Sequence, residues 1–215
     1  MEREVPALEG RLAVLTDWIY FLFLIQMMWF AGVLTGGLVL GLIPSTYAVF
    51  AVIRKRLQNK DVKFSRCFWQ CYKLFFWQLQ APGLVWILIG VFIYYDIRLL
   101  LSYQHIAGFI TGSVFVSLLL IYILATILLF PISAHYELST FNKVRLAVLI
   151  AITMPNISIV LTAGTLAFYF AVSSFPILLL FFGLSVPALL YTKFAMRAFE
   201  KMDDRDFIRN VKESI

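Results

Sequence analysis

Residues 146–192 read LAVLIAITMPNISIVLTAGTLAFYFAVSSFPILLLFFGLSVPALLYT, and none of these 47 residues is Asp, Glu, Lys or Arg. A helix needs about 20 apolar residues to cross the roughly 30 Å hydrocarbon core of a bilayer. Three further stretches without these charged residues cover 36 residues from Trp18, 22 residues from Leu74 and 38 residues from Leu99. We therefore expect most of the chain to be embedded in a membrane.

The composition supports this class of protein. Hydrophobic residues make up 62% of the 215 residues and charged residues only 14%, whereas a typical soluble domain has about 25% charged residues. The sequence thus predicts an all-α, polytopic transmembrane helical bundle that forms a single domain over residues 1–215. Five spans are expected near Trp18–Leu42, Lys73–Tyr95, His105–Phe130, Val144–Val172 and Phe175–Tyr191.

Basic residues are distributed unevenly around these spans. Of the 18 Lys and Arg residues, 15 fall after the first span, before the fourth or after the last, and three fall on the other side. Cytoplasmic loops carry such an excess. We therefore expect a basic cytoplasmic loop at residues 54–66, a cytoplasmic tail at residues 192–215 and an outer, interfacial segment at residues 1–17. The net charge of +6 is read as an orientation signal, not as a nucleic-acid footprint.

The first uncharged stretch is too long for one straight crossing, because 36 helical residues extend about 54 Å. One interpretation is a single crossing that kinks at Pro44 and continues as a surface helix. The alternative is a hairpin at Gly36–Gly37, which gives six spans and a cytoplasmic N-terminus. We favour the single crossing, since a two-glycine turn leaves each arm only about 17 residues, the lower limit for a span.

Five prolines lie near the expected cytoplasmic ends of the spans: Pro44, Pro82, Pro131, Pro155 and Pro187. Proline removes a backbone donor and kinks a helix. Such kinks are tolerated in membranes where neighbouring groups satisfy the freed carbonyl. The pattern predicts Pro-kinked helices with cytoplasmic extensions. It fits a duplicated helical hairpin, and it also fits prolines that gather wherever helices leave the hydrocarbon.

Small residues are spaced for helix packing in the pairs Gly32-x3-Gly36 and Gly37-x3-Gly41. Glycines one turn apart allow two helix backbones to approach closely. The contact is either within this bundle or with a partner subunit.

A sequence pattern around the end of the first span resembles the YesL-like family of small bacterial membrane proteins. It consists of Trp29, Gly36, Gly37, Gly41 and Pro44-Ser45-Thr46 followed by Ala48 and a basic cluster. The segment CFWQCYKLFFWQ at residues 67–78 matches the family's aromatic and basic start of the second span. The resemblance implies a plasma-membrane protein without established catalytic activity. It also implies an association with carbohydrate uptake, including binding-protein-dependent importers.

Two groups of residues are candidates for function. The basic cluster consists of Arg54, Lys55, Arg56, Lys60, Lys63 and Arg66. It serves orientation and phospholipid contact, or it docks a partner such as a sugar-importer permease. The polar set near Pro82 and Pro155 consists of Gln78, Gln80, Asn156 and Thr162. It lines a cavity for a polar solute, or it forms interhelical hydrogen bonds that satisfy kinked backbone.

We expect no enzyme activity, no metal and no cofactor. Cys67 and Cys71 lie four residues apart, but no zinc-site spacing accompanies them. No P-loop, catalytic triad or nucleic-acid module is present in the sequence. The predicted function is an accessory or regulatory component of carbohydrate uptake that lies in the lipid bilayer. The alternative is a small transporter or membrane substrate-binding subunit; the oligomeric state is not indicated.

Overall fold

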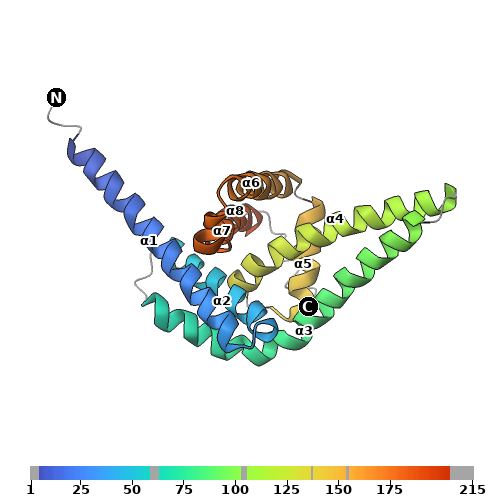
Figure 1. Ribbon diagram of the computed structural model, residues 1–215, viewed down its shortest axis with the longest axis horizontal. Helices are drawn as coiled ribbons and strands as arrows, with labels where there is room; N and C mark the ends of the chain where they lie inside the picture. The colour runs from blue at the N-terminus through green and yellow to red at the C-terminus, as the bar shows by residue number, and fades with distance from the viewer. Residues whose placement is uncertain (1–4, 59–62, 103–105, 137, 154, 204–215) are drawn as a thin grey trace.

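A computed structural model describes residues 5–58, 63–102, 106–136, 138–153 and 155–203 (Figure 1). The described residues form helices without strands, which confirms the all-α class. The helices are α1 (Val5–Thr35), α2 (Val39–Leu57), α3 (Phe64–Ser102), α4 (Ile106–His135), α5 (Thr140–Thr153), α6 (Pro155–Ser174), α7 (Ile177–Phe182) and α8 (Ser185–Asp203).

Helix α1 ends at a glycine turn. The backbone N–H of Leu38 donates to the carbonyl of Val33 (2.9 Å), and that of Gly37 donates to the carbonyl of Leu34 (3.2 Å). Gly37 has a φ of 73°. These bonds and this left-handed residue define a Schellman motif, in which glycine avoids the steric cost of a Cβ. The expected continuous helix through Trp18–Leu42 is therefore wrong. The chain turns at Gly36–Gly37, as in the hairpin alternative, and α2 folds back along α1 (Figure 1).

The two arms of this hairpin touch through glycine. A Cβ placed on Gly41 would lie 2.6 Å from the carbonyl oxygen of Val33 and 2.7 Å from that of Gly32. Gly36 is packed against Gly41 in the same way. Gly37 has open space around it and serves the turn instead. Three of the four glycines expected to pack helices therefore lie in a contact within this chain.

The hairpin also changes the expected layout of the chain ends. The guanidinium of Arg56, near the end of α2, lies 5.4 Å from the centroid of the Trp18 ring in α1. Residues 1–17 and 54–66 were expected on opposite faces of the membrane. Because α2 runs back along α1, the structure instead places Trp18 and Arg56 at the same end of the hairpin.

Helix α8 is held to α1 by a buried glutamine. The side-chain oxygen of Gln26 accepts hydrogen bonds from the backbone N–H groups of Leu184 (3.0 Å) and Ser185 (3.1 Å). These donors lie at the start of α8, where backbone N–H groups have no partner within the helix. Gln26 is only 1% exposed. Apolar side chains of α1, α2, α3 and α8 form one core cluster around it.

Three described helices are long and apolar enough to cross a membrane: residues Leu12–Thr35, Phe64–Ser102 and Gly108–His135. The fourth expected span is divided into α5 and α6, which run in different directions (Figure 1), and the fifth into α7 and α8. Pro155 is the first residue of α6 and Pro187 the third of α8. Proline is tolerated in the first turn of a helix, so these two prolines lie where one helix has ended and the next begins. Pro44, Pro82 and Pro131 lie inside helices.

Substitution of Gly41 tests the hairpin contact. Gly41→Ala should lower the free energy of unfolding by about 1–3 kcal/mol, because the added methyl overpacks a backbone contact. Gly164→Ala is the matched control, since its Cβ would meet only Leu190 at 3.8 Å. Thermal unfolding of the purified protein in detergent measures both. Equal stability of the two variants would contradict the contact.

Candidate functional site

A cavity of about 270 Å³ lies where α2, α3, α4 and α5 meet, and we call it the Pro82 cavity. Figure 1 shows that α3 bends between its two halves, and Pro82 lies in that part of the helix. The proline lacks the N–H that would bond the carbonyl four residues earlier, which favours such a bend. Ile43 of α2 packs against Gly83 beside the bend, and a Cβ on Gly83 would require the Ile43 side chain to shift.

Most polar atoms in the middle of this cavity are bonded to one another. The indole N–H of Trp86 donates to the Thr126 hydroxyl (2.9 Å), which donates to the Tyr122 carbonyl (2.7 Å). The Tyr122 hydroxyl donates to the Trp86 carbonyl (2.9 Å). The rings of Trp86 and Tyr122 are stacked, with centroids 4.8 Å apart. These bonds join α3 to α4 and leave a largely apolar wall.

The end of the cavity beside α5 has a different character. Ser133, Thr140 and Lys143 line it there. The Tyr47 hydroxyl donates to the Ser133 carbonyl (3.3 Å) and joins α2 to α4 at this end. The cavity therefore has an apolar body and a polar end that carries a cation.

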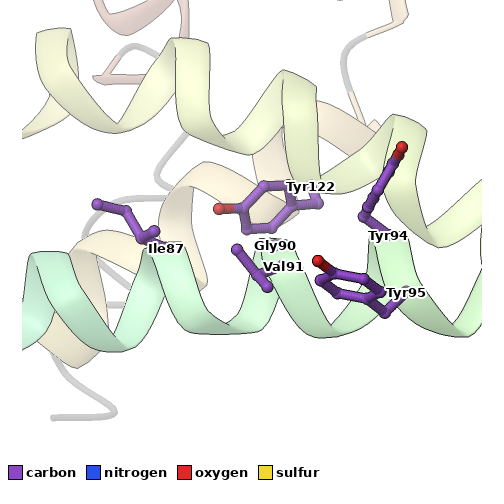
Figure 2. Close-up of a pocket in the computed structure, with 6 residues that line it drawn as sticks. All are labelled: Ile87, Gly90, Val91, Tyr94, Tyr95 and Tyr122. Atoms are coloured by element: carbon purple, nitrogen blue, oxygen red, sulfur yellow. The ribbon is translucent and has the colours of Figure 1, made fainter.

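A second, more open hollow follows on the outer part of the α3–α4 seam (Figure 2). This tyrosine groove has a volume of about 480 Å³ and is lined by Ile87, Gly90, Val91, Tyr94, Tyr95 and Tyr122. Figure 2 shows Tyr122 reaching from α4 toward Gly90 of α3. Gly90 makes room for this ring, because a Cβ there would lie 2.6 Å from the Tyr122 hydroxyl. Ile87 and Tyr122 belong to both hollows.

The expected polar set does not line the Pro82 cavity. Gln80 is buried in the α2–α3 contact, and its amide nitrogen donates to the Leu40 carbonyl at 2.6 Å. That carbonyl has no helical donor, because the residue four positions later is Pro44. Gln78 and Thr162 are exposed. The side chain of Asn156 lies outside the described residues. Gln80 thus donates a hydrogen bond to a backbone carbonyl that Pro44 leaves without a helical donor. This is the interhelical role that the sequence analysis gave as the alternative to a solute site.

The first half of the basic cluster is turned into the bundle. Arg54 donates to the Ala134 carbonyl of α4, and the Lys55 ammonium donates to the Cys67 sulfur (3.2 Å). Arg56 lies over the rings of Phe21 (5.2 Å) and Phe64 (5.0 Å) as well as Trp18. All three cations are half-buried. They join α2 to its neighbours, so they are poor candidates for a partner surface.

The second half of the cluster is exposed. Lys63 and Arg66 are exposed, whereas Lys60 lies outside the described residues. Lys73, Leu74 and Trp77 are also exposed, Trp77 by 79%. Because residues three, four and seven apart share a helix face, Arg66, Lys73 and Trp77 form one stripe along the first half of α3, and Lys63 immediately precedes the helix. We define the basic stripe as Lys63, Arg66, Lys73 and Trp77.

Two features of the structure could not be predicted from the sequence. The cavity wall combines side chains from four helices, including Tyr47, Tyr122 and Lys143, and none of these was singled out. Gln26 lies in an uncharged stretch and has no neighbouring motif. The only available signal was that a polar side chain inside a span needs a partner. Nearby prolines drew attention to Gln80, but no such neighbour marks Gln26.

The role of Gln80 is testable. Gln80→Leu should lower the free energy of unfolding by about 1–3 kcal/mol, because it leaves the buried Leu40 carbonyl without a donor. Gln78→Leu removes the same functional group from an exposed position of the same helix and should leave stability nearly unchanged. Chemical unfolding in mixed micelles gives both values. A loss of equal size in the two variants would refute the assignment.

Comparisons with known proteins agree on one family. The family described as "Protein of unknown function, DUF624" matches residues 22–97. "Uncharacterized protein YteU" of Bacillus subtilis (strain 168) is 32% identical over 184 residues, which cover 82% of this chain and 80% of that protein. "Uncharacterized protein YesL" of the same strain is 28% identical over 189 residues, covering 87% and 89% respectively. No solved structure shows a significant match. The resemblance seen in the sequence is confirmed, and the chain belongs to the YesL-like family of DUF624 proteins.

Proposed function

We propose that this protein is a non-enzymatic accessory component linked to carbohydrate uptake, which docks a sugar-importer permease through its basic stripe. The link to carbohydrate uptake rests on what the family resemblance implies. The docking rests on one observation. Lys63, which immediately precedes α3, and Arg66 and Lys73 of α3 are exposed, whereas Arg54, Lys55 and Arg56 make contacts inside the bundle. Exposed cations interleaved with Trp77 suit a partner with an acidic surface, since Arg and Trp are enriched in binding hot spots.

The proposed location is the bacterial plasma membrane, with the C-terminus in the cytoplasm. Arg54 at the end of α2 bonds Ala134 near the end of α4, which brings two basic segments to one face of the bundle. This grouping supports the proposed orientation, because basic segments stay in the cytoplasm. Since Trp18 lies at the same end as Arg56, the proposal places residue 18 toward the cytoplasmic side as well.

Charge reversal tests the docking. The triple variant Lys63→Glu, Arg66→Glu, Lys73→Glu should reduce copurification of a co-expressed sugar-importer permease at least tenfold, a loss of about 1.4 kcal/mol or more. Its thermal stability should stay close to that of the unaltered protein, because these side chains are exposed. The double variant Arg98→Glu, Arg145→Glu reverses exposed charges elsewhere and should copurify normally. Unchanged copurification of the triple variant would reject the stripe as the contact.

The Pro82 cavity favours a second candidate, a membrane subunit that binds a small solute. Its volume of about 270 Å³ lies near the lower end of the roughly 300–1,000 Å³ usual for ligand sites. It lies between helices, where ligand sites of bundles are commonly found. Hydroxyl groups at Ser133 and Thr140 offer hydrogen bonds at its polar end.

Calorimetry tests this candidate directly. Titration with mono- and disaccharides should give saturable heats if the solute is a sugar. Thr140→Val should then weaken binding about 2- to 10-fold, the usual worth of one hydrogen bond. Thr16→Val, on the exposed start of α1, is the control and should bind like the unaltered protein. Absence of heat with every saccharide would remove sugars as the solute.

A further inference from the structure

A lysine and two cysteines lie together between α2 and α3, apart from the residues of the basic stripe and of the Pro82 cavity. The Lys55 ammonium of α2 donates to the Cys67 sulfur of α3 at 3.2 Å. The side chain of Cys71, one turn further along α3, is hydrogen-bonded to Cys67. Cys67 is only 2% exposed, whereas Lys55 and Cys71 are half-buried. We call these three residues the dithiol site.

The spacing of the two cysteines disfavours a disulfide between them. Residues four apart on a helix have Cβ atoms about 5–6 Å apart, whereas the Cβ atoms of a disulfide lie about 3.5–4.5 Å apart. An S–S bond between Cys67 and Cys71 would therefore distort α3, which is helical on both sides of the pair. An ion between the two sulfur atoms bridges the wider gap and leaves the backbone where it is.

The kind and number of donors restrict which ion fits. Thiolates select soft ions such as Cu(I). A structural zinc site needs four ligands, but no group of three or more His, Cys, Asp or Glu side chains that could hold a metal occurs within the described ranges. Two sulfur ligands are sufficient for a soft monovalent ion, which forms linear complexes with two thiolates.

The Lys55 ammonium balances the charge of such a complex. Two thiolates and one monovalent cation together carry one net negative charge. A charge removed from water is costly unless an opposite charge lies beside it, and the ammonium 3.2 Å from the Cys67 sulfur provides that charge. Its hydrogen bond to the sulfur is also compatible with metal binding, because groups that bond to metal ligands from outside orient them and tune the metal.

Aromatic side chains surround the buried part of the dithiol site. Cys67 and Phe68 belong to the buried core cluster that contains residues of α1, α2, α3 and α8, and Phe64 and Trp69 pack against it. A hydrophobic shell of this kind controls the access of water to a bound ion. The half-buried Cys71 leaves one side of the site open for an ion to enter.

We propose that the dithiol site binds one Cu(I) ion, with Cys67 and Cys71 as its ligands and Lys55 as the neighbouring countercharge. Each thiol releases one proton to water when its sulfur binds the ion, and no electron is transferred. The proposal goes beyond the permease and solute candidates and does not rest on them. It departs from the expectation of no metal, because that expectation considered zinc spacing and the sequence does not place Lys55 beside Cys67.

Competition with a Cu(I) chelator tests the site. The reduced full-length protein in nanodiscs is titrated anaerobically with copper in excess ascorbate, with bicinchoninate as the coloured competitor. The protein should remove one Cu(I) per chain from the chelator, and X-ray absorption at the copper edge should show two sulfur ligands. Ag(I) should displace the copper and Zn(II) should not. Failure to remove copper from the chelator, or displacement by Zn(II), would overturn the proposal.

Variants of the two ligands test the assignment of the sulfur atoms. The chain contains no cysteine besides Cys67 and Cys71. Cys67→Ser and Cys71→Ser should each weaken Cu(I) binding more than about 100-fold, because loss of a ligand costs more than loss of an outer partner. Thermal unfolding of each variant verifies that it is folded. A folded variant that binds Cu(I) as tightly as the unaltered protein would overturn the proposal.

Variants of Lys55 test the countercharge. Lys55→Met removes the ammonium from a side chain of similar shape and should weaken Cu(I) binding about 10- to 100-fold, the usual effect of losing an outer partner of a metal ligand. Lys55→Arg keeps a cation and should bind more tightly than Lys55→Met. Lys193→Gln removes an exposed cation of α8 and should bind like the unaltered protein. Equal affinity of Lys55→Met and the unaltered protein would contradict the charge balance on which the proposal rests.

Discussion

The close contact between α1 and α2 is the constraint on which the rest of the structure depends. In a membrane, lipid tails are as apolar as the side chains, so helices associate through close packing and interhelical hydrogen bonds. Gly36 and Gly41 let the two backbones touch. The tight hairpin then presents carbonyl groups to α3, where the Tyr72 hydroxyl bonds Gly32 at 3.0 Å and Gln80 bonds Leu40. Helix α8 is attached to α1 by the hydrogen bonds that the backbone at its start donates to Gln26.

Polar side chains inside this bundle mainly satisfy backbone. An unpaired carbonyl or N–H in hydrocarbon costs several kcal/mol, so a backbone group freed at an irregular position of a helix is stabilised by a side-chain partner. Pro44 leaves the Leu40 carbonyl without a helical donor, and Gln80 donates to it. At the start of α8 two backbone N–H groups have no helical acceptor, and Gln26 accepts from both. This requirement explains why glutamines that look like ligands of a solute serve the fold. It also explains why the Pro82 cavity keeps polar character only at its α5 end.

The class of the fold could be predicted from the sequence, but the turn between α1 and α2 and the contacts between helices could not. Long uncharged runs predict helices in hydrocarbon, because a helix needs about 20 apolar residues to cross the bilayer core. Gly36 and Gly37 fit both a packed straight helix and a turn, and only the bonds from Gly37 and Leu38 back to α1 decide for the turn. Spacing along one helix likewise cannot bring Tyr47 to Ser133, 86 residues away. Arg54 was recognised as basic, but its bond to Ala134 depends on how α2 and α4 meet.

The distance between Asp17 and Gln58 tests the hairpin most directly. Spin labels are attached to cysteines at these two positions, in a protein whose native Cys67 and Cys71 are replaced by alanine, and the distance is measured by pulsed electron resonance in nanodiscs. The fold predicts a distribution centred below ~25 Å, since packed helices lie roughly 8–10 Å apart and Arg56 touches Trp18. A continuous helix would separate the same residues by about 60 Å, and a distribution near that value would contradict the account.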